Sequence, residues 1–301
     1  MALDFKARVA IVTGAGGGLG RQHALALAAR GAKVVVNDLG AALNGTGGSV
    51  SAAQSVVDEI RSAGGQAIVN GASVTDFGAV EKMVQQAMDT WGRVDIVVSN
   101  AGILRDKSFA KMDLADFRHV LDVHLMGAVH CCKAVWPHMT AQKYGRIVLT
   151  TSSSGLYGNF GQTNYGAAKL ALVGLMQTLA IEGAKHDIRV NCLAPTAATR
   201  MTESLFPPDM LQAFGPQAVV PAMLVMASQY APTRTTLCAG AGAFEAAHIT
   251  LTRGVFIGTG PDADEALAAR LSEVLDRTGE TVPGGGHGQG ENELRLARAG
   301  H

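Results

Sequence analysis

The sequence predicts an α/β fold with a central parallel sheet and helices on both faces, and three observations support this prediction. Strand-like and helix-like patterns alternate through the first half of the 301 residues, as in parallel sheets with right-handed crossovers. A glycine-rich turn joins the first strand to the first helix. Polar residues follow three further predicted strands, namely Asp38, Asn100 and Ser152. Ligands of such sheets bind beyond the carboxyl ends of the strands, so we expect these residues to border one site.

The first strand and the turn after it predict a dinucleotide site. Residues 8–13 (RVAIVT) form a short β-branched run typical of a buried parallel strand. Residues 14–20 (GAGGGLG) follow, and a helical pattern then runs to Gly31. Glycines at this point permit a tight turn and a close approach of the backbone to a pyrophosphate, which lies against the helix N-terminus. A plain flexible turn is the alternative.

The second strand, residues 33–37, is followed by Asp38, eighteen residues beyond Gly20. A carboxylate about 20 residues after the glycine turn is placed to bind the hydroxyl groups of the adenosine ribose. It would repel a 2′-phosphate, and no basic residue follows it or interrupts the glycine turn, so NAD is favoured over NADP. A solvated carboxylate at a strand end is the alternative.

The next elements extend the alternation. Residues 40–49 form a glycine-rich loop on the adenosine side. The expected elements after it are a helix at about 50–63, a strand at 66–70, a helix at 76–90 and a strand at 94–98. That strand ends in Ser-Asn-Ala-Gly, where small residues allow the backbone to lie beside a cofactor and Asn100 could either tie the strand ends together or contact the ligand.

A long helix is expected over about 113–139, followed by a strand at 146–150 and a helix at about 164–185. The long helix carries four histidines whose spacings of 5, 6 and 8 residues do not form the i, i+4 pair of a zinc helix: His119, His124, His130 and His138. No metal site is predicted from them.

Ser152, Tyr165 and Lys169 suggest a proton-transfer site at the end of the strand at 146–150. A spacing of four residues places Tyr165 and Lys169 on one helix face, and Ser152 lies thirteen residues before the tyrosine. A tyrosine with a pKa near 10 is a poor base at neutral pH, but a neighbouring cation favours the phenolate. We therefore expect Lys169 to lower the pKa of Tyr165 and Ser152 to hold a substrate oxygen. A chance pair on a helix surface is the alternative.

The last third of the chain is less regular. A strand at 188–194 ends at Pro195, and residues 196–217, rich in proline and methionine, suit a lid over an apolar substrate or an ordinary surface connection. A helix at 218–228, a last short strand at 242–246 and an amphipathic helix at 262–278 are expected. Residues 283–290 have no core-forming pattern and should be flexible. The domain organisation predicted is a nucleotide-binding domain over 1–260 and a C-terminal extension over 261–301.

Composition excludes several classes of function. With 25 basic and 25 acidic residues, nothing favours nucleic acid or an anionic membrane as a partner. No uninterrupted apolar run approaches the roughly 20 residues of a membrane span, and the N-terminus lacks a signal-peptide pattern. Four cysteines without metal spacing are expected as buried thiols in a reducing compartment: Cys131, Cys132, Cys192 and Cys238. The last residues do not match a peroxisomal address, and a cytoplasmic location is expected.

On these motifs the chain resembles the short-chain dehydrogenase/reductase family. The matching segments are TGAGGGLG (13–20), SNAG (99–102), Ser152 and YGAAK (165–169), in family order over about 250 residues. The resemblance implies a single three-layer Rossmann domain with a parallel sheet of about seven strands, and hydride transfer between NAD(P) and an alcohol or ketone. It also implies that Tyr165 is the acid/base, that Lys169 tunes it and binds the nicotinamide ribose, and that Ser152 positions the carbonyl. Pairing through the helices at 113–139 and 164–185 into a homodimer or homotetramer is implied as well.

The resemblance also assigns cofactor contacts. They are expected at the glycine turn, the strand ends and the start of the lid: Gly14, Gly18, Leu19, Gly20, Asp38, Ser73, Val74, Asn100, Ala101, Gly102, Tyr165, Lys169, Pro195, Ala197 and Thr199. His124 stands where many members have an asparagine that supports a proton-relay water, which implies a changed relay. The acid that often contacts adenine is replaced by Ala72, and the usual Pro-Gly is Pro195-Thr196.

A narrower resemblance concerns substrate. Residues 34–40, 100–112, 143–175 and 194–203 are similar to the (3R)-hydroxyacyl-CoA dehydrogenase units of peroxisomal multifunctional enzymes. This implies an acyl-CoA thioester as substrate, and oxidation of a (3R)-3-hydroxyacyl-CoA to the 3-oxoacyl-CoA. The alternatives are a 3-oxoacyl-carrier-protein reductase, a steroid-type alcohol dehydrogenase, or a nucleotide-binding protein without turnover.

Overall fold

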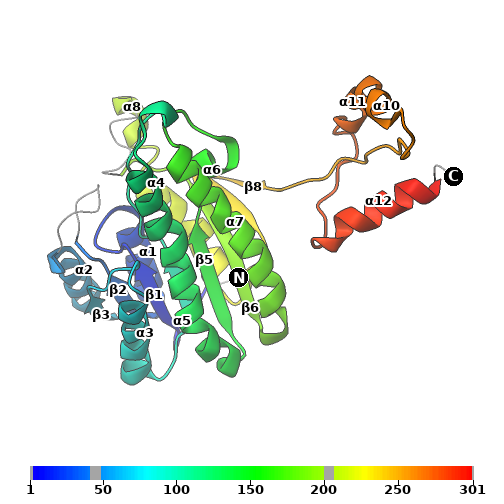
Figure 1. Cartoon of the computed structure of the whole chain (residues 1–301). Helices are drawn as coiled ribbons and strands as arrows, with labels where there is room; N and C mark the ends of the chain where they lie inside the picture. Colours follow the sequence, from blue (N-terminus) through cyan, green and yellow to red (C-terminus); the bar gives the residue numbers. More distant parts are fainter. Residues whose placement is uncertain (1–2, 41–48, 200–206, 300–301) are drawn as a thin grey trace. The chain divides into compact units, whose positions relative to one another are not determined.

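The computed structural model describes residues 3–40, 49–199 and 207–299 (Figure 1). It divides into two compact units, Met1–Ala247 and His248–His301. The first unit carries the sheet and every predicted site residue. The second unit begins earlier in the chain than the extension expected at 261–301.

The first unit is built on one sheet with the strand order β3-β2-β1-β4-β5-β6-β7-β8. All neighbours from β3 to β7 are parallel, and β8 is antiparallel to β7. The strands are β1 Val9–Thr13, β2 Lys33–Asn37, β3 Gln66–Asn70, β4 Ile96–Ser99, β5 Gly145–Thr150, β6 Ile188–Pro195, β7 Thr236–Gly240 and β8 Ala243–Ala247. The expected parallel sheet of about seven strands is confirmed, with an antiparallel eighth strand added at one edge. The order reverses at β1, which lies between β2 and β4, and this is where such sheets bind dinucleotides.

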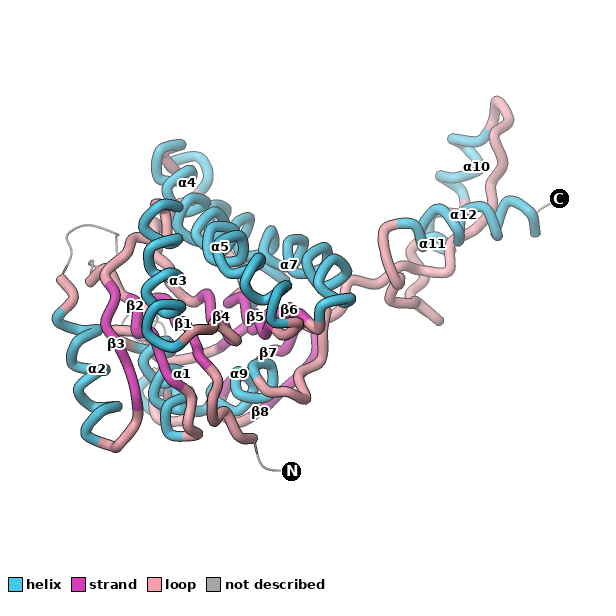
Figure 2. The backbone as a smooth tube through the Cα atoms, turned by 90° about the horizontal axis from the view of Figure 1, so that it is seen from below, coloured by secondary structure: helices cyan, strands magenta, loops and turns pink. Residues whose placement is uncertain are grey.

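Helices cover both faces of the sheet (Figure 2). One layer consists of α1 Gly18–Ala29, α2 Ser51–Ser62 and α9 Val220–Ala227. The other consists of α3 Phe77–Trp91, α5 Gly127–Gln142 and α7 Thr163–Gly183, and α4 Leu114–Leu121 packs against α7. Short elements complete the unit: α6 Ser153–Tyr157, α8 Pro208–Leu211, η1 Phe109–Lys111, η2 Asp122–Met126, η3 Ala184–His186 and η5 Pro216–Val219.

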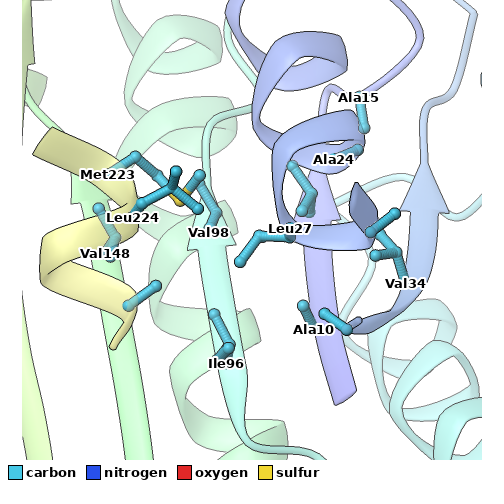
Figure 3. Packing of buried hydrophobic residues seen from close by; sticks show 14 of the residues in the cluster. Ala10, Ala15, Ala24, Leu27, Val34, Ile96, Val98, Val148, Met223 and Leu224 are labelled. Carbon is cyan, nitrogen blue, oxygen red and sulfur yellow. The ribbon is translucent and has the colours of Figure 1, made fainter. Parts of the chain in front are cut away.

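Alternate residues of each strand enter the two cores, because side chains of a strand point to opposite faces. Val34 and Val36 pack toward α1 and α9, whereas Val35 packs toward α3 and α5. Figure 3 shows the first core, in which strand residues such as Val98 meet Leu27 of α1 and Met223 of α9. Burial on both faces explains why these strands have continuous apolar sequences rather than alternating ones.

The amino ends of the strands are joined by charged side chains. The fully buried Asp95 carboxylate accepts hydrogen bonds from Arg8 (2.9 Å), from Arg93 (2.6 and 2.7 Å) and from the backbone N–H of Val9 (2.9 Å). This cluster joins the start of β1 to the start of β4, at the amino ends of the strands, whereas the predicted site lies at their carboxyl ends.

A second group of polar contacts, around Arg146, also lies at the amino ends of the strands. The guanidinium of Arg146, which is 1% exposed, donates to the backbone carbonyl of Ser228 (2.9 Å) and forms an ion pair with Asp187 (3.0 Å). The ring of Tyr144 lies between this guanidinium and that of Arg8, with centroid distances of 4.1 and 3.7 Å. Charged groups therefore join the starts of β1, β4, β5 and β6.

The structure differs from the predicted elements at four places. The single helix expected at 113–139 is α4, a π-helical turn (η2) and α5, because one extra residue is accommodated at 122–126. Strand β7 was not predicted. The helix expected at 262–278 is two short helices, α10 Ala263–Ala269 and α11 Leu271–Val274, and residues 287–299, partly within the segment expected to be flexible, form α12.

The second unit has no apolar core among its described residues. From 248 to 299 only Gly285 is buried, while Ile249, Leu275 and Leu294 are more than half exposed. A single β-bridge joins Leu251 to Thr281.

Among the described helices, the stretch Thr163–His186 alone is long and apolar enough to cross a membrane by length and composition. It packs against β6 within the first unit, where residues such as Leu172 and Met176 enter the core.

Candidate active site

The glycine turn after β1 is fixed by close backbone packing. Gly14 has a φ of +64°, and a Cβ there would lie 2.8 Å from the Cα of Ala101. A Cβ on Gly20 would lie 2.2 Å from the carbonyl oxygen of Gly14, so α1 can approach the turn only if this residue is glycine. The side chain of Thr199 lies 3.5 Å from the position of a Cβ on Gly18. The structure thus brings Thr199, from the chain after β6, to the N-terminus of α1, where a pyrophosphate would bind.

Asp38 follows β2, and its carboxylate lies against this turn. One oxygen accepts the backbone N–H of Gly16 at 2.8 Å, and the other accepts that of Gly40 at 2.7 Å. The carboxylate is therefore held in one orientation at the adenosine side of the turn. The glycine-rich loop expected at 40–49 falls largely outside the described residues.

Asn100 acts as a tie between strand ends. Its side-chain amide donates to the carbonyl oxygens of Thr13 (3.0 Å) and Gly14 (3.2 Å). The backbone N–H groups of Asn100 and Ala101 donate to the Thr13 hydroxyl, at 3.0 and 3.1 Å. These contacts show that Asn100 ties the strand ends together, and its contact with a cofactor stays a prediction.

Ser73 and Val74 lie beyond β3, on the side expected for adenine. Val74 packs on Gly127, where a Cβ would lie 2.7 Å from the valine methyl. The Val74 carbonyl accepts a hydrogen bond from Nδ1 of His130 at 2.8 Å. Ser73 bonds to Thr75 through the two hydroxyls, which are 2.8 Å apart. His130 thus fixes the backbone of the segment after β3, a role that its sequence position did not reveal.

Pro195 and Ala197 continue from the end of β6. Pro195 pairs with Ala239 of β7, and the backbone N–H of Thr196 donates to the carbonyl of Ala239 at 2.8 Å. Ala197 is buried. Within the expected lid at 196–217, residues 200–206 lie outside the described residues, and the rest contains α8 and η5.

Ser152, Tyr165 and Lys169 meet at the end of β5. Ser152 caps α6, where its hydroxyl accepts the backbone N–H of Ser154 at 3.2 Å. The ammonium of Lys169 is 3% exposed, lies 5.4 Å from the centroid of the Tyr165 ring and donates to the carbonyl of Thr150 at 2.5 Å. The predicted helix face is confirmed, since both residues lie on α7 one turn apart.

The expected depression of the Tyr165 pKa is not found. Burial raises the pKa of Tyr165 above its usual value, and the hydrogen bond with Ser152 opposes this shift. Burial also lowers the pKa of Lys169 to about 7, because a low-dielectric environment disfavours its charged form. Burial is thus the largest cause of both shifts, and it opposes the charged form of each group.

His124 lies in the π-helical turn and is 4% exposed. Its Nε2 is 2.8 Å from the carbonyl oxygen and 3.1 Å from the backbone nitrogen of Ile103. Its ring meets that of Tyr165 edge to face, with centroids 5.1 Å apart. Burial and the nearby Lys169 hold the pKa of His124 well below 6.5, so the imidazole is neutral. A Cβ on Gly102 would lie 2.3 Å from this ring, which explains the glycine there.

Two further polar residues support the catalytic group, and neither was singled out from the sequence. The Thr151 hydroxyl donates to the carbonyl oxygen of Lys169 at 2.6 Å. Asn164 is fully buried, accepts the backbone N–H of Tyr165 at 2.7 Å and donates to the carbonyl of Arg105 at 3.0 Å. Their positions directly beside Ser152 and Tyr165 in the sequence are the signal that could have pointed to them.

Comparisons with known proteins agree with this geometry. Residues 8–209 match the family described as short chain dehydrogenase. The peroxisomal hydratase-dehydrogenase-epimerase of Saccharomyces cerevisiae is 55% identical over 224 residues, which are 74% of this chain and 25% of the yeast protein. The peroxisomal multifunctional enzyme type 2 of Mus musculus is 54% identical over 222 residues, 74% of this chain and 30% of the mouse protein. The chain therefore spans about a quarter to a third of the length of these relatives.

Other relatives are matched over most of their own length. A short-chain type dehydrogenase/reductase of Mycobacterium tuberculosis is 48% identical over 92% of this chain and 97% of its own. A 3-oxoacyl-[acyl-carrier-protein] reductase of Synechocystis is 44% identical over 68% of this chain and 81% of its own.

Two solved structures are similar to the chain. Full-length peroxisomal multifunctional enzyme type 2 from Drosophila melanogaster has a TM-score of 0.83 at 35% identity, covering 99% of this chain and 50% of that one. A 7α-hydroxysteroid dehydrogenase complexed with NADH and a 7-oxo bile acid has a TM-score of 0.72 at 30% identity, covering 80% and 95%. The sheet, the glycine turn, the Ser-Tyr-Lys group and these relatives agree, and the chain belongs to the short chain dehydrogenase family of oxidoreductases, which act on CH–OH groups with NAD(P).

Proposed function

We propose that the chain interconverts a (3R)-3-hydroxyacyl-CoA and the corresponding 3-oxoacyl-CoA with NAD as cofactor. The observation that carries the substrate class is the identity of 54–55% to the yeast and mouse peroxisomal enzymes over 222 to 224 residues. A role in fatty acid metabolism follows from the same likeness.

The preference for NAD is supported by Asp38. Its carboxylate is fixed by Gly16 and Gly40 at the end of β2, where the adenosine ribose is expected. A fixed negative charge at this point favours ribose hydroxyls and disfavours the 2′-phosphate of NADP.

The residues of the chain fit the handling of a nicotinamide cofactor and the proton of the substrate. When bound, NAD would exchange hydride with the substrate carbon. The glycine turn and the N-terminus of α1 would hold its pyrophosphate, and Lys169 would bond the nicotinamide ribose. Ser152 would hold the substrate oxygen, and Tyr165 would take the proton from the hydroxyl during oxidation and return it during reduction.

The proposal is tested by turnover with defined substrates. The purified chain is mixed with acetoacetyl-CoA and either NADH or NADPH, and in the reverse direction with each enantiomer of 3-hydroxybutyryl-CoA. We expect oxidation of NADH much faster than of NADPH, and activity confined to the 3R enantiomer. Turnover of the 3S enantiomer, or a preference for NADPH, would contradict the proposal.

A second candidate is favoured by two of the relatives. The likeness to a 3-oxoacyl-[acyl-carrier-protein] reductase and to a 7α-hydroxysteroid dehydrogenase supports a carrier-protein thioester or a steroid alcohol as substrate. The same assay with an acyl-carrier-protein thioester and with hydroxysteroids separates these possibilities. The fold and catalytic group would be unchanged by that outcome.

We also propose that the chain forms a homo-oligomer through α5 and α7. Exposed apolar side chains on α7, among them Leu170 (45%) and Ile181 (54%), support this pairing. Light scattering after size-exclusion chromatography gives the mass, and a mass of one chain at micromolar concentration would contradict it.

A further inference from the structure

The loop after β4 is fastened to the catalytic residues at several points. We call residues 103–107 the clamp segment. At its start, both backbone polar groups of Ile103 lie within hydrogen-bonding distance of His124, at 2.8 and 3.1 Å. In its middle, the carbonyl of Arg105 accepts the buried amide of Asn164 at 3.0 Å. The segment therefore connects the π-helical turn to the first turn of α7.

The end of the clamp segment is bound to the residues just before α7. The side-chain amide of Gln162, only 8% exposed, donates to one oxygen of the Asp106 carboxylate at 2.7 Å. The oxygen of the same amide accepts a hydrogen bond from Asn159 at 3.1 Å. The backbone N–H of Lys107 donates to the carbonyl of Gly161 at 2.9 Å. Both ends of the Gln162 amide are thus occupied, so it is fixed in orientation and it fixes Asp106.

Gln162 directly precedes α7 and stands three residues before Tyr165. It has no side-chain bond to the helix N-terminus, although its position is that of a cap. Its buried amide serves Asp106 instead. The Gln162–Asp106 bond consequently links the first turn of α7, which carries the phenol, to a segment that is also held by His124.

Asp106 also differs from the other groups around the phenol in its charge. Ionisable groups approach Tyr165 from three elements, namely Lys169 from α7, His124 from η2 and Asp106 from the clamp segment. The imidazole of His124 is neutral, and burial lowers the pKa of Lys169 to about 7. The negative charge of Asp106 raises the pKa of Tyr165.

The charges next to Asp106 have a different partner. Arg105 and Lys107 form ion pairs with Asp116 of α4, at 2.6 and 3.3 Å. Asp116 is thus an ion-pair partner of both cations, whereas Asp106 accepts a hydrogen bond from the uncharged amide of Gln162.

We propose that Asp106 is a positioning residue for Tyr165, which together with Gln162 fixes the first turn of α7 to the clamp segment and carries a negative charge on that segment. This inference rests on the proposed acid/base role of Tyr165 and not on the choice of substrate. Its consequence is that the tyrosine loses its proton at higher pH than it would without Asp106.

The test uses two substitutions that separate the bond from the charge. Asp106→Asn keeps an oxygen that can accept from Gln162 but removes the charge, whereas Asp106→Ala removes both. We measure kcat and KM for alcohol oxidation from pH 6 to 10 at low salt and at 1 M NaCl, with NADH affinity from fluorescence. Asp89→Asn is the matched control, because Asp89 accepts the same kind of bond from Gln85 (2.7 Å) on the exposed surface of α3.

For Asp106→Asn we expect the rising limb of kcat against pH to move down by roughly 0.5 unit at low salt, as for a charge near a protein surface. The shift should disappear at 1 M NaCl, because Asp106 is exposed and its field is screened. Asp106→Ala should show the same shift and, since the first turn of α7 is less well held, a kcat lower by about tenfold. NADH affinity and the Asp89→Asn profile should match those of the unmodified protein.

Superimposable pH profiles for the Asp106→Asn variant and the unmodified protein at low salt would overturn the proposal, as would a shift that persists in 1 M NaCl. A lower kcat in Asp106→Ala without any movement of the pH limb would show a structural role alone and would also overturn it. The Tyr165→Phe variant keeps the two proposals apart. If Tyr165→Phe retains activity, the acid/base assignment fails; if it is inactive while Asp106→Asn behaves like the unmodified protein, only the role of Asp106 fails.

Discussion

At the scale of single residues, the site is governed by burial. Lys169 and His124 are almost fully buried, and burial lowers the pKa of both. The attraction between Lys169 and a Tyr165 phenolate is opposed by the cost of removing each charge from water. The phenol therefore remains protonated at neutral pH in the protein alone, which suits its use as an acid in the reduction of a ketone.

Replacing Tyr165 by Phe tests the acid/base assignment with little change in packing. Only the hydroxyl is lost, so the edge-to-face contact of the ring with His124 should remain. We expect kcat to fall at least about a hundredfold, the usual contribution of a general acid or base, while NADH affinity changes little. Steady-state rates and NADH fluorescence titration check this, and activity within tenfold of the unmodified protein would refute the role.

His23 predicts how stability depends on pH. It is fully buried on α1, both ring nitrogens lack a partner among the described residues, and burial lowers its pKa from 6.5 to about 4. The folded state thus keeps the histidine neutral while the unfolded state binds a proton below pH 6.5. Stability attributable to this group is complete above pH 6.5 and falls by about 3 kcal/mol as the pH drops to 4.

His23→Leu should remove this part of the pH dependence. Urea unfolding at pH 7, 5.5 and 4.5 gives the free energies of unfolding, and the decline between pH 6.5 and 4.5 should be clearly smaller in the variant. His138→Leu, at a partly exposed position, is the control and should follow the unmodified protein. Equal slopes for His23→Leu and the unmodified protein would show that another group causes the decline.

Site residues at strand ends were predictable because each follows a short apolar run, as Asp38, Asn100 and Ser152 do. Asp106, Gln162 and His130 were not, because the partners that give them their roles lie 56 residues away in sequence. The pKa of Tyr165 was not predictable either, since it depends on how completely Lys169 is desolvated.

At the scale of elements, the strands of the nucleotide-binding half were predicted closely. β2 begins and ends at the expected residues, because it lies inside the sheet with a buried run of three valines. β3 also has its expected bounds, although it is the edge strand and only partly buried. β7 was missed because its sequence, TLCAG, is short and only partly buried. The π-helical turn within 114–142 was missed because an extra residue in a helix leaves the apolar pattern nearly unchanged, yet this turn is where His124 points toward Tyr165.

The contact between the glycine turn and α1 gives a prediction for these elements. Gly20→Ala would place a Cβ 2.2 Å from the Gly14 carbonyl, so α1 must move away from the turn. We expect NADH affinity to fall at least about tenfold, because the amide groups of the turn and of the helix N-terminus would no longer converge on one pyrophosphate. Isothermal titration calorimetry measures the affinity.

Gly174→Ala is the control for the same substitution in a helix. Nothing lies within 4 Å of a Cβ at this position in α7, so alanine should raise stability by about 0.5–1 kcal/mol through the lower entropy of the unfolded chain. NADH affinity should not change. If both variants bind NADH normally, close packing at Gly20 is not required for the cofactor.

At the scale of the molecule, the two ends of the strands in the first unit carry different groups of side chains. The carboxyl ends of its strands carry the candidate site, while the amino ends of β1, β4, β5 and β6 are joined by charged groups around Asp95 and Arg146. The length of the strands, which are covered by the two apolar cores, separates the carboxyl ends from the amino ends.

Asp95→Asn tests this separation. The buried carboxylate accepts four hydrogen bonds, and losing its charge would leave Arg8 and Arg93 without their partner. Because both guanidiniums are partly exposed, we expect a loss of about 2–3 kcal/mol of stability rather than the full cost of a buried pair. The KM for the substrate and NADH affinity should be unchanged at temperatures where the variant is folded. A change in KM with little loss of stability would show that the amino ends of the strands influence the site at their carboxyl ends.

The separation of the site from the charged groups at the amino ends also affects how such a sequence can diverge. Residues of the loops at the carboxyl ends of the strands can be substituted to suit a new substrate. Such substitutions need not disturb the ion pairs at the amino ends of the strands. Losses of stability that accompany a new loop can, in turn, be offset by substitutions around Tyr144 that never touch the ligand. With this arrangement, single substitutions at the carboxyl ends can change the substrate, and single substitutions at the amino ends can recover the stability that was lost.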